Sequence, residues 1–304
     1  MINSNYLIKK IISECEKIIL DKELQIKLSL ASFLSNSHIL IEDIPGVGKT
    51  TLAKTLSHVL GLDYARVQFT SDLLPSDILG VNYYNTKEST FTFKKGPIFT
   101  QFLLADEINR ASSKTQSALL EAMEEYSVTI DGKSIKLDDI FFVIATKNPY
   151  EEVGTYELPS SQLDRFAISF SLGYPSHKAE RKILQRKSTN ISTLDSVTQD
   201  ELNLIKNSYK TIYVNDDILD LLQEILKFTR DSGLYKNGLS TRAALILIDI
   251  SKAWALIHSR DFVIPSDVTT VLPYITRHRL ILQEGRTNPM EIADEILKNI
   301  HPDK

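Results

Sequence analysis

The chain has 304 residues, about two domains at roughly 150 residues per domain, and it needs neither disulfides nor metals to bury a core. It contains 35 Lys and Arg residues and 39 Asp and Glu residues, which gives a formal net charge of −4, and the charges are mixed along the sequence. This balance argues against a dedicated nucleic-acid or membrane-surface binder. With 42% hydrophobic and 24% charged residues, the composition excludes a largely disordered or fibrous chain.

The N-terminal residues have no basic region followed by a long apolar region, and no stretch is apolar enough to cross a bilayer. We therefore expect a cytoplasmic protein without membrane insertion. Cys15 is the only cysteine, so an intrachain disulfide and a cysteine zinc site are both excluded. We expect it to be a small buried hydrophobe on an amphipathic helix rather than a catalytic thiol.

Apolar spacing predicts strands that alternate with helices over the first half of the chain. The expected elements are a helix over 6–34 with a break at 20–22, a strand at 38–42, a helix over 50–60, strands at 66–69 and 102–105, a helix through 118–123 and a strand at 140–145. Such alternation predicts a mostly parallel sheet with both faces covered. Two β-hairpins, at 81–95 and 128–135, are expected to interrupt it, the second turning at Asp131-Gly132.

The second half of the chain is predicted to be all helical. The expected helices are 176–187, 198–209, 216–231, 240–258, 266–277 and 288–299. We place the boundary after residue 175, which gives an α/β domain over 1–175 and a helical domain over 176–304. The basic run Arg277-His278-Arg279 ends one of these helices, and we expect it to be solvated rather than bound to nucleic acid.

Residues 43–50 read Asp-Ile-Pro-Gly-Val-Gly-Lys-Thr between a predicted strand and a predicted helix. This context indicates a phosphate-binding loop, in which glycines expose backbone N–H groups and a helix N-terminus attracts anions. Lys49 is expected to neutralise phosphates, and the Thr50 hydroxyl to ligate Mg²⁺. An ordinary glycine turn and a dinucleotide-binding loop are both disfavoured, the latter because its third glycine is absent. The expected ATP-binding residues of the loop are Pro45, Gly46, Val47, Gly48, Lys49, Thr50 and Thr51.

A second acidic site follows the apolar strand 102–105, where Asp106 and Glu107 stand side by side. We expect Asp106 to bind ATP-associated Mg²⁺ through water, together with Thr50, and Glu107 to polarise the attacking water as general base. Because neighbours on a strand face opposite sides, we expect the two carboxylates to point apart. A solvated acidic strand end is the alternative, and the upstream phosphate loop makes it the weaker one.

An ordered set of motifs makes the chain resemble the MoxR family of AAA+ ATPases over nearly its whole length. The matching segments are Ile44-Pro45-Gly46-Val47-Gly48-Lys49-Thr50, Val67-Gln68-Phe69-Thr70, Gly96-Pro97-Ile98-Phe99, Ala105-Asp106-Glu107-Ile108-Asn109-Arg110, Leu119-Leu120-Glu121-Ala122-Met123, Ala145-Thr146-Lys147-Asn148-Pro149 and Gln162-Leu163-Asp164-Arg165-Phe166. The resemblance implies an αβα sandwich with a parallel sheet, two hairpin insertions and an all-α lid. It also implies ATP hydrolysis with Mg²⁺, assembly as a homo-oligomeric ring, expected to be a hexamer, and chaperone-like remodelling of a protein client, one with a von Willebrand factor A domain being a candidate.

The resemblance assigns three further residues. Asn148 matches sensor 1, which contacts the γ-phosphate or the attacking water, although a turn before Pro149 would also explain it. Arg165 matches the arginine finger offered to the ATP of a neighbouring subunit, and a surface ion pair with Asp164 is its alternative. Arg242 matches sensor 2 in the lid and is expected to contact the nucleotide in the same or the neighbouring subunit. The predicted catalytic residues are thus Glu107, Asn148 and Arg165.

Three positions depart from the family pattern. Asp43 stands at the first glycine of the general phosphate-loop motif, and Lys147 stands where glutamine is usual. Leu20-Asp21-Lys22 occupies the segment that lies near the adenine in the family, so base selection stays open. Two other functions also stay open: a nucleotide-gated scaffold with little hydrolysis, and a chelatase-like motor subunit. The hairpin aromatics, among them Tyr83 and Phe91, are expected either to contact a client or to pack on their own domain.

Overall fold

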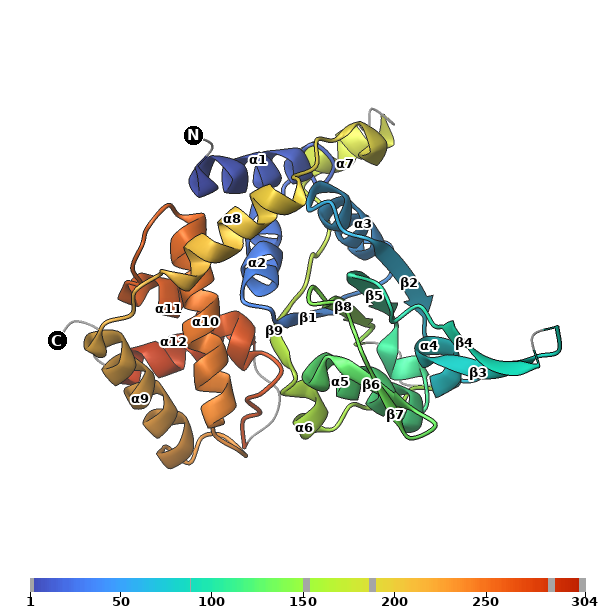
Figure 1. Cartoon of the computed structure of the whole chain (residues 1–304). Coiled ribbons are helices and arrows are strands. Elements are labelled where there is room, and N and C mark those ends of the chain that lie inside the picture. The colour runs from blue at the N-terminus through green and yellow to red at the C-terminus, as the bar shows by residue number, and fades with distance from the viewer. Residues whose placement is uncertain (1–2, 88, 150–153, 186–189, 284–287, 301–304) are drawn as a thin grey trace.

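The computed structural model describes residues 3–87, 89–149, 154–185, 190–283 and 288–300. Its central strands are β1 (His38–Glu42), β2 (Tyr64–Gln68), β5 (Phe102–Asp106), β8 (Phe142–Lys147) and β9 (Phe166–Phe170). They form one sheet in the order β2-β5-β8-β1-β9, and every neighbouring pair is parallel (Figure 1). The prediction of a parallel sheet is confirmed. Because all strands run the same way, their carboxyl ends share one edge.

Strand β9 was not predicted from the sequence. All five of its residues are buried, and Phe166, Ile168 and Phe170 pair with β1. Like β5 it is buried on both faces, but the polar Ser169 interrupts its apolar run, which weakens the signal for a buried strand. The helix α11 (Pro265–Thr276) packs against it, so this outer strand of the sheet is covered by the lid.

Helices cover both faces of the sheet. In the first part of the chain they are α1 (Ser4–Glu16), α2 (Glu23–Leu34), α3 (Lys49–Val59), α4 (Pro75–Leu79), α5 (Ser113–Glu125) and α6 (Ser160–Leu163), with a short 3₁₀ turn at Ile108–Arg110. The break between α1 and α2 is confirmed, and Asp21 there has a positive φ of 63°. Ile39 and Ile41 join one core cluster with α1, α2 and α3, while Leu40 faces the other, under α5. The result is the expected αβα sandwich.

The lid consists of α7 (His177–Leu184), α8 (Gln199–Lys210), α9 (Asp216–Asp231), α10 (Thr241–Ile257), α11 and α12 (Pro289–Asn299). Figure 1 shows α9 to α12 gathered on the side of the sheet away from the hairpins. Buried residues of α8 to α12 belong to the same cluster as those of α1 and α2. The division into 1–175 and 176–304 stays a prediction, because apolar packing is continuous across it.

Both predicted hairpins are present. The first pairs β3 (Gly80–Asn85) with β4 (Thr90–Lys95), and it extends away from the sheet in Figure 1. The second pairs β6 (Ser127–Ile130) with β7 (Lys133–Lys136). At its turn Asp131 and Gly132 have φ of 49° and 77°, the positive values that a two-residue hairpin turn requires. Asn82 donates a 2.7 Å hydrogen bond to Asp131, which ties the hairpins together.

Cys15 is buried in α1, as predicted. Burial raises the pKa of its thiol to about 12, with the neighbouring Glu14 and Glu16 adding to the effect, so the reactive thiolate is disfavoured. Among the helices of the described ranges, none combines the length and apolar character that a membrane span requires.

Candidate functional site

The loop after β1 has the conformation that the sequence predicts for phosphate binding. Gly46 and Gly48 have φ of 85° and 100°, which side chains with a Cβ rarely adopt, and Gly48 caps the N-terminus of α3. The positive end of α3 therefore faces the loop. The Lys49 side chain is buried and its ammonium donates to the carbonyls of Asp43 at 2.7 Å and Ile44 at 3.2 Å. A cation is thus held within the loop.

Asp43 has a structural role that explains its departure from the general motif. One carboxylate oxygen accepts the N–H of Ile44 at 2.8 Å, and the other accepts the N–H of Gly173 at 2.7 Å. Gly173 lies just before the first lid helix and has a positive φ of 63°. A glycine at position 43 would leave both donors without this acceptor. Asp43 therefore connects the phosphate loop to the segment that leads into the lid.

A cavity of about 350 Å³ opens beside this loop. It is lined by Pro45, Gly46, Gly48, Lys49, Thr50, Thr51, Arg66, Gln68, Asp106 and Glu107. Val47 is only half buried and packs instead against the apolar core. The cavity brings the predicted phosphate-binding residues together with both predicted carboxylates. Its cations and backbone donors suit a polyphosphate, and its hydroxyl and carboxylate oxygens suit a divalent metal.

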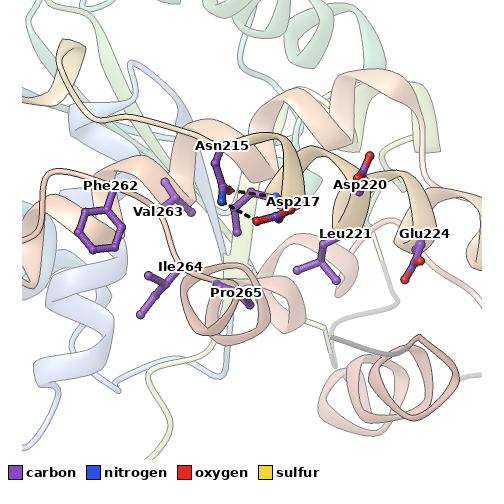
Figure 2. A pocket seen from close by; sticks show the side chains of 10 residues that line it. Asn215, Asp217, Asp220, Leu221, Glu224, Phe262, Val263, Ile264 and Pro265 are labelled. Atoms are coloured by element: carbon purple, nitrogen blue, oxygen red, sulfur yellow. Dashed lines mark hydrogen bonds between the residues drawn. The ribbon is translucent and has the colours of Figure 1, made fainter. Parts of the chain in front are cut away.

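A second cavity, of about 340 Å³, lies in the lid between the start of α9 and residues 262–265 (Figure 2). Asp217, Asp220 and Glu224 line it from α9, with Asp217 accepting a 3.0 Å hydrogen bond from Asn215, and Phe262 lies opposite them. The two cavities are nearly equal in volume, so chemistry distinguishes them. Three carboxylates repel a polyphosphate, whereas the cavity at the phosphate loop offers the Lys49 cation and a helix N-terminus, so we take it as the candidate nucleotide site.

Asp106 ends β5 with both carboxylate oxygens engaged. Oδ1 accepts a 2.6 Å hydrogen bond from the Thr146 hydroxyl of β8, and Oδ2 accepts from Arg66 of β2, at 2.7 Å from Nη2 and 3.2 Å from Nε. The Thr146 oxygen in turn accepts the backbone N–H of Glu107 at 2.9 Å. The buried Thr146 side chain therefore fixes the two acidic residues relative to each other.

Glu107 leaves the strand direction with a φ of 56°, in the left-handed region. The expectation that strand alternation points the two carboxylates apart is wrong, because Glu107 is no longer on the strand and both carboxylates line the same cavity. Its Oε2 accepts from Gln68 at 2.9 Å and from Arg110 at 3.0 Å. A non-glycine residue in this conformation is strained by about 1–3 kcal/mol, a cost that is common at functional sites.

Asn148 directly follows β8, whose last residue, Lys147, pairs with Glu42 at the end of β1. The asparagine side chain is buried and lies at the carboxyl edge of the sheet, between the strands that carry the phosphate loop and Asp106. It is not among the residues that line the cavity. Its position fits the sensor assignment, and its role stays a prediction.

Arg165 and Arg242 lie at the opposite edge of the sheet, where the strands begin. Arg165 precedes Phe166, which pairs with His38 at the start of β1, so the five-residue strand separates it from the phosphate loop by about 16 Å along the strand. Its guanidinium pairs with Glu124 of α5 at 2.9 Å, rather than with Asp164 as the alternative proposed. Arg242, at the start of α10, pairs with the same carboxylate at 3.0 Å. Neither arginine lines the cavity of its own chain.

The expectation of a solvated basic run at 277–279 is wrong. Arg279 is buried and donates to the Asp164 carboxylate at 2.7 Å, to Phe166 O at 2.6 Å and to Ala167 O at 2.9 Å. His278 is buried beside it, and burial, then the charge of Arg279, holds its pKa well below the ordinary histidine value. Because the lid packs over β9, these side chains attach the lid to the segment that carries Arg165.

Four residues of this arrangement were not assigned a role from the sequence. They are Arg66, Gln68, Glu124 and Thr146. A sequence signal existed for the first two, because Arg66 and Gln68 alternate on a strand next to the predicted acidic strand and therefore share a face. The other two depend on contacts between distant segments, which spacing alone does not reveal.

Comparisons with known proteins identify the family to which the chain belongs. Residues 38–168 match the AAA family, described as ATPases associated with various cellular activities, and residues 227–300 match an AAA lid domain. A phosphate loop, a parallel sheet of this order and a helical lid define an AAA+ ATPase. The chain is 37% identical to Chaperone MoxR1 of Mycobacterium tuberculosis over 97% of this chain and 80% of that protein. It belongs to the MoxR family of AAA+ ATPases.

Two further relatives support the family assignment. The uncharacterized protein YeaC of Bacillus subtilis is 44% identical, over 91% of this chain and 87% of that protein. A crystal structure of a protein from Cytophaga hutchinsonii superposes with a TM-score of 0.90 at 36% identity, covering 98% of this chain and 95% of the other. Both the α/β part and the lid therefore have structural counterparts in one known protein.

Proposed function

We propose that this chain hydrolyses ATP in a Mg²⁺-dependent manner within a ring of identical subunits, expected to be a hexamer, and uses the turnover to remodel a protein client. One observation carries the proposal: the site residues are divided between the carboxyl ends and the amino ends of the strands of one sheet. The phosphate loop, Asp106 and Glu107 line one cavity, while Arg165 and Arg242 lie at the far edge. A complete site then needs two copies of the chain.

Within one chain, Lys49 and the N-terminus of α3 bind the phosphates of ATP. Glu107 is held at the cavity by Gln68 and Arg110, where its carboxylate can take a proton from the attacking water. Asn148, at the same edge, orients that water or the γ-phosphate. These residues supply positioning and proton transfer, which are the protein's main tasks in phosphoryl transfer.

The donor set also fits Mg²⁺. The Thr50 hydroxyl and the Asp106 carboxylate line the same cavity, and oxygen atoms are the ligands that this ion prefers. One Asp106 oxygen already accepts a hydrogen bond from the positively charged Arg66, so this position suits a cation. When bound, the ion would neutralise developing charge on the phosphates.

From a neighbouring copy, Arg165 would stabilise charge that develops on the phosphoryl oxygens, and Arg242 would bring the lid into contact with the same nucleotide. The shared Glu124 holds both guanidinium groups close together before assembly. A head-to-tail contact of this kind closes into a ring when its rotation permits.

The first hairpin offers a surface for the client. Tyr83, Tyr84 and Phe91 are exposed, with 75% of Phe91 accessible, whereas Phe93 packs edge-on against Phe99 with ring centroids 5.6 Å apart. Tyr84 and Phe91 also pack against each other, with ring centroids 5.4 Å apart, but both remain exposed. Exposed aromatic residues on a projecting hairpin suit contact with a protein. Replacing Phe91 by serine should leave basal turnover unchanged and reduce the amount of client that co-purifies from native lysate.

The substitution Glu107→Gln tests the catalytic proposal. The variant should bind ATP and assemble while its hydrolysis falls by about 100-fold or more, because the amide cannot accept the proton of water. Glu125→Gln, an exposed position on α5, is the matched control and should hydrolyse ATP normally. Near-normal turnover of Glu107→Gln would exclude Glu107 as the base. An assembled wild-type protein without turnover would instead support a nucleotide-gated scaffold.

A further inference from the structure

Arg66 connects the two carboxylates of the candidate site. Its guanidinium donates twice to Oδ2 of Asp106 and also to the side-chain oxygen of Gln68, at 2.9 Å. Gln68 donates from its amide nitrogen to Glu107. A continuous chain of hydrogen bonds therefore runs from the predicted metal-binding carboxylate to the predicted general base. All four side chains line the nucleotide cavity.

The bonds to Arg66 occupy the part of Asp106 that a metal would use. A carboxylate oxygen has two lone pairs, and both on Oδ2 are engaged, by Nε and Nη2 of Arg66. Oδ1 is bound by the hydroxyl of the buried Thr146, which has no solvent-exposed position to move to. Of the two partners, Arg66 is the one free to leave, because 45% of its side chain is exposed.

Exposure also limits the strength of the Arg66–Asp106 pair. Water reaches and screens the guanidinium, which is 45% exposed, although the carboxylate is only 10% exposed, and a divalent cation in the same place carries twice the charge. Mg²⁺ arriving with a nucleotide can therefore displace the guanidinium. Once Arg66 leaves, the side-chain oxygen of Gln68 loses its hydrogen-bond donor. The Gln68 side chain is then less firmly held, and so is its hydrogen bond to Glu107.

We propose that Arg66 is a displaceable counter-ion, which neutralises Asp106 in the metal-free site, yields Oδ2 to Mg²⁺ and thereby loosens the hold of Gln68 on Glu107. The proposal rests on the proposed function, because it assumes that Asp106 takes part in binding Mg²⁺. Arg66 is then a positioning residue that competes with the metal. A phosphate ligand at this position would instead assist nucleotide binding.

Metal affinity measures this competition without any catalytic turnover. Mn²⁺ is titrated into the full-length protein with saturating AMP-PNP, and free Mn²⁺ is followed by electron paramagnetic resonance. Arg66→Gln should bind Mn²⁺ about three- to tenfold more tightly than wild type, because the competing cation is gone. Arg66→Lys, which keeps the charge but lacks the forked donors, should lie between them. Lys210→Gln removes one exposed charge on the lid and should match wild type.

A second measurement distinguishes a counter-ion of Asp106 from a phosphate ligand. AMP-PNP binding in EDTA should differ by less than about twofold between wild type and Arg66→Gln, since a counter-ion of Asp106 does not hold the phosphates. Equal or weaker Mn²⁺ binding by Arg66→Gln overturns the proposal, and so does a large loss of AMP-PNP binding in EDTA, which would make Arg66 a phosphate ligand. A wild-type protein that binds neither AMP-PNP nor Mn²⁺ contradicts the proposed function itself. Thermal unfolding of each variant verifies that strand β2, which carries Arg66, remains folded.

Discussion

Arg165 at the start of β9 and Arg242 at the start of α10 bind the two oxygens of one carboxylate, that of Glu124, at 2.9 Å and 3.0 Å. The two arginines come from the α/β part and from the lid, and α5 supplies the acid between them. The two arginines proposed to contact a neighbour's nucleotide are therefore positioned before any neighbour binds. Their common counter-ion also limits repulsion between two adjacent guanidinium groups.

Replacing Glu124 by glutamine should lower ATP turnover of the assembled protein by about three- to tenfold, because the two arginines lose their common anchor. ATP binding should not change, since Glu124 lies at the edge of the sheet away from the phosphate loop. Steady-state hydrolysis and nucleotide titration measure the two effects separately. Glu125→Gln, one residue further along α5, is the control. Equal turnover of the two variants would show that Glu124 does not position the arginines.

Replacing Arg279 by methionine should destabilise the protein by about 3 kcal/mol, because it leaves the Asp164 carboxylate and several carbonyls without their donor in a mostly buried place. Urea unfolding followed by tryptophan fluorescence is a suitable measurement, since Trp254, the single tryptophan, is buried in the lid helix α10. Arg277→Met is the neighbouring control. A loss below about 1 kcal/mol would contradict the role assigned to Arg279.

Asp43→Ala should lower stability by about 1–2 kcal/mol, because the N–H groups of Ile44 and Gly173 lose their acceptor in a buried place. Asp43→Asn keeps one carbonyl oxygen and should recover part of the loss. If the loop and the linker are coupled through this carboxylate, the alanine variant should also bind ATP more weakly. Unfolding and nucleotide titration check both effects, and wild-type ATP binding by the alanine variant would argue against the coupling.

Stability should fall in mild acid because of His38. Burial holds the pKa of this histidine at about 4, below its ordinary value of 6.5, and the neutral ring fits its contacts: Nδ1 accepts from Val143 N and Nε2 donates to Met123 O. Between these values the unfolded chain binds a proton that the folded chain does not, so stability decreases as the pH falls from 6.5 towards 4. The expected contribution of His38 to the slope is about 1.4 kcal/mol per pH unit, and the buried His278, whose pKa is also lowered, adds to the slope in the same direction. Urea unfolding across this range should show a flatter slope for His38→Gln; an unchanged slope would contradict the assignment.

The sequence was sufficient to predict the phosphate loop, the acidic strand end, both hairpins and the helical lid. These features depend on local spacing, as at Asp131-Gly132, where the turn geometry follows from two residues. Strand β9 escaped prediction because Ser169 interrupts its apolar run, whereas the equally buried β5 has a continuous one. The burial of Arg279 and the left-handed conformation of Glu107 also escaped, because both arise from how distant segments pack rather than from their neighbours in sequence.

Mixing two inactive variants reveals whether a second copy of the chain completes each active site. Glu107→Gln lacks the base of its own cavity, and Arg165→Ala lacks the arginine offered to a neighbour, so each alone should be nearly inactive. In an equimolar mixed assembly about one quarter of the interfaces would combine an intact Glu107 with an intact Arg165. We predict that mixing restores ATP turnover towards that fraction of wild type. Turnover that stays at the level of the separate variants, although mixed assemblies form, would contradict the account.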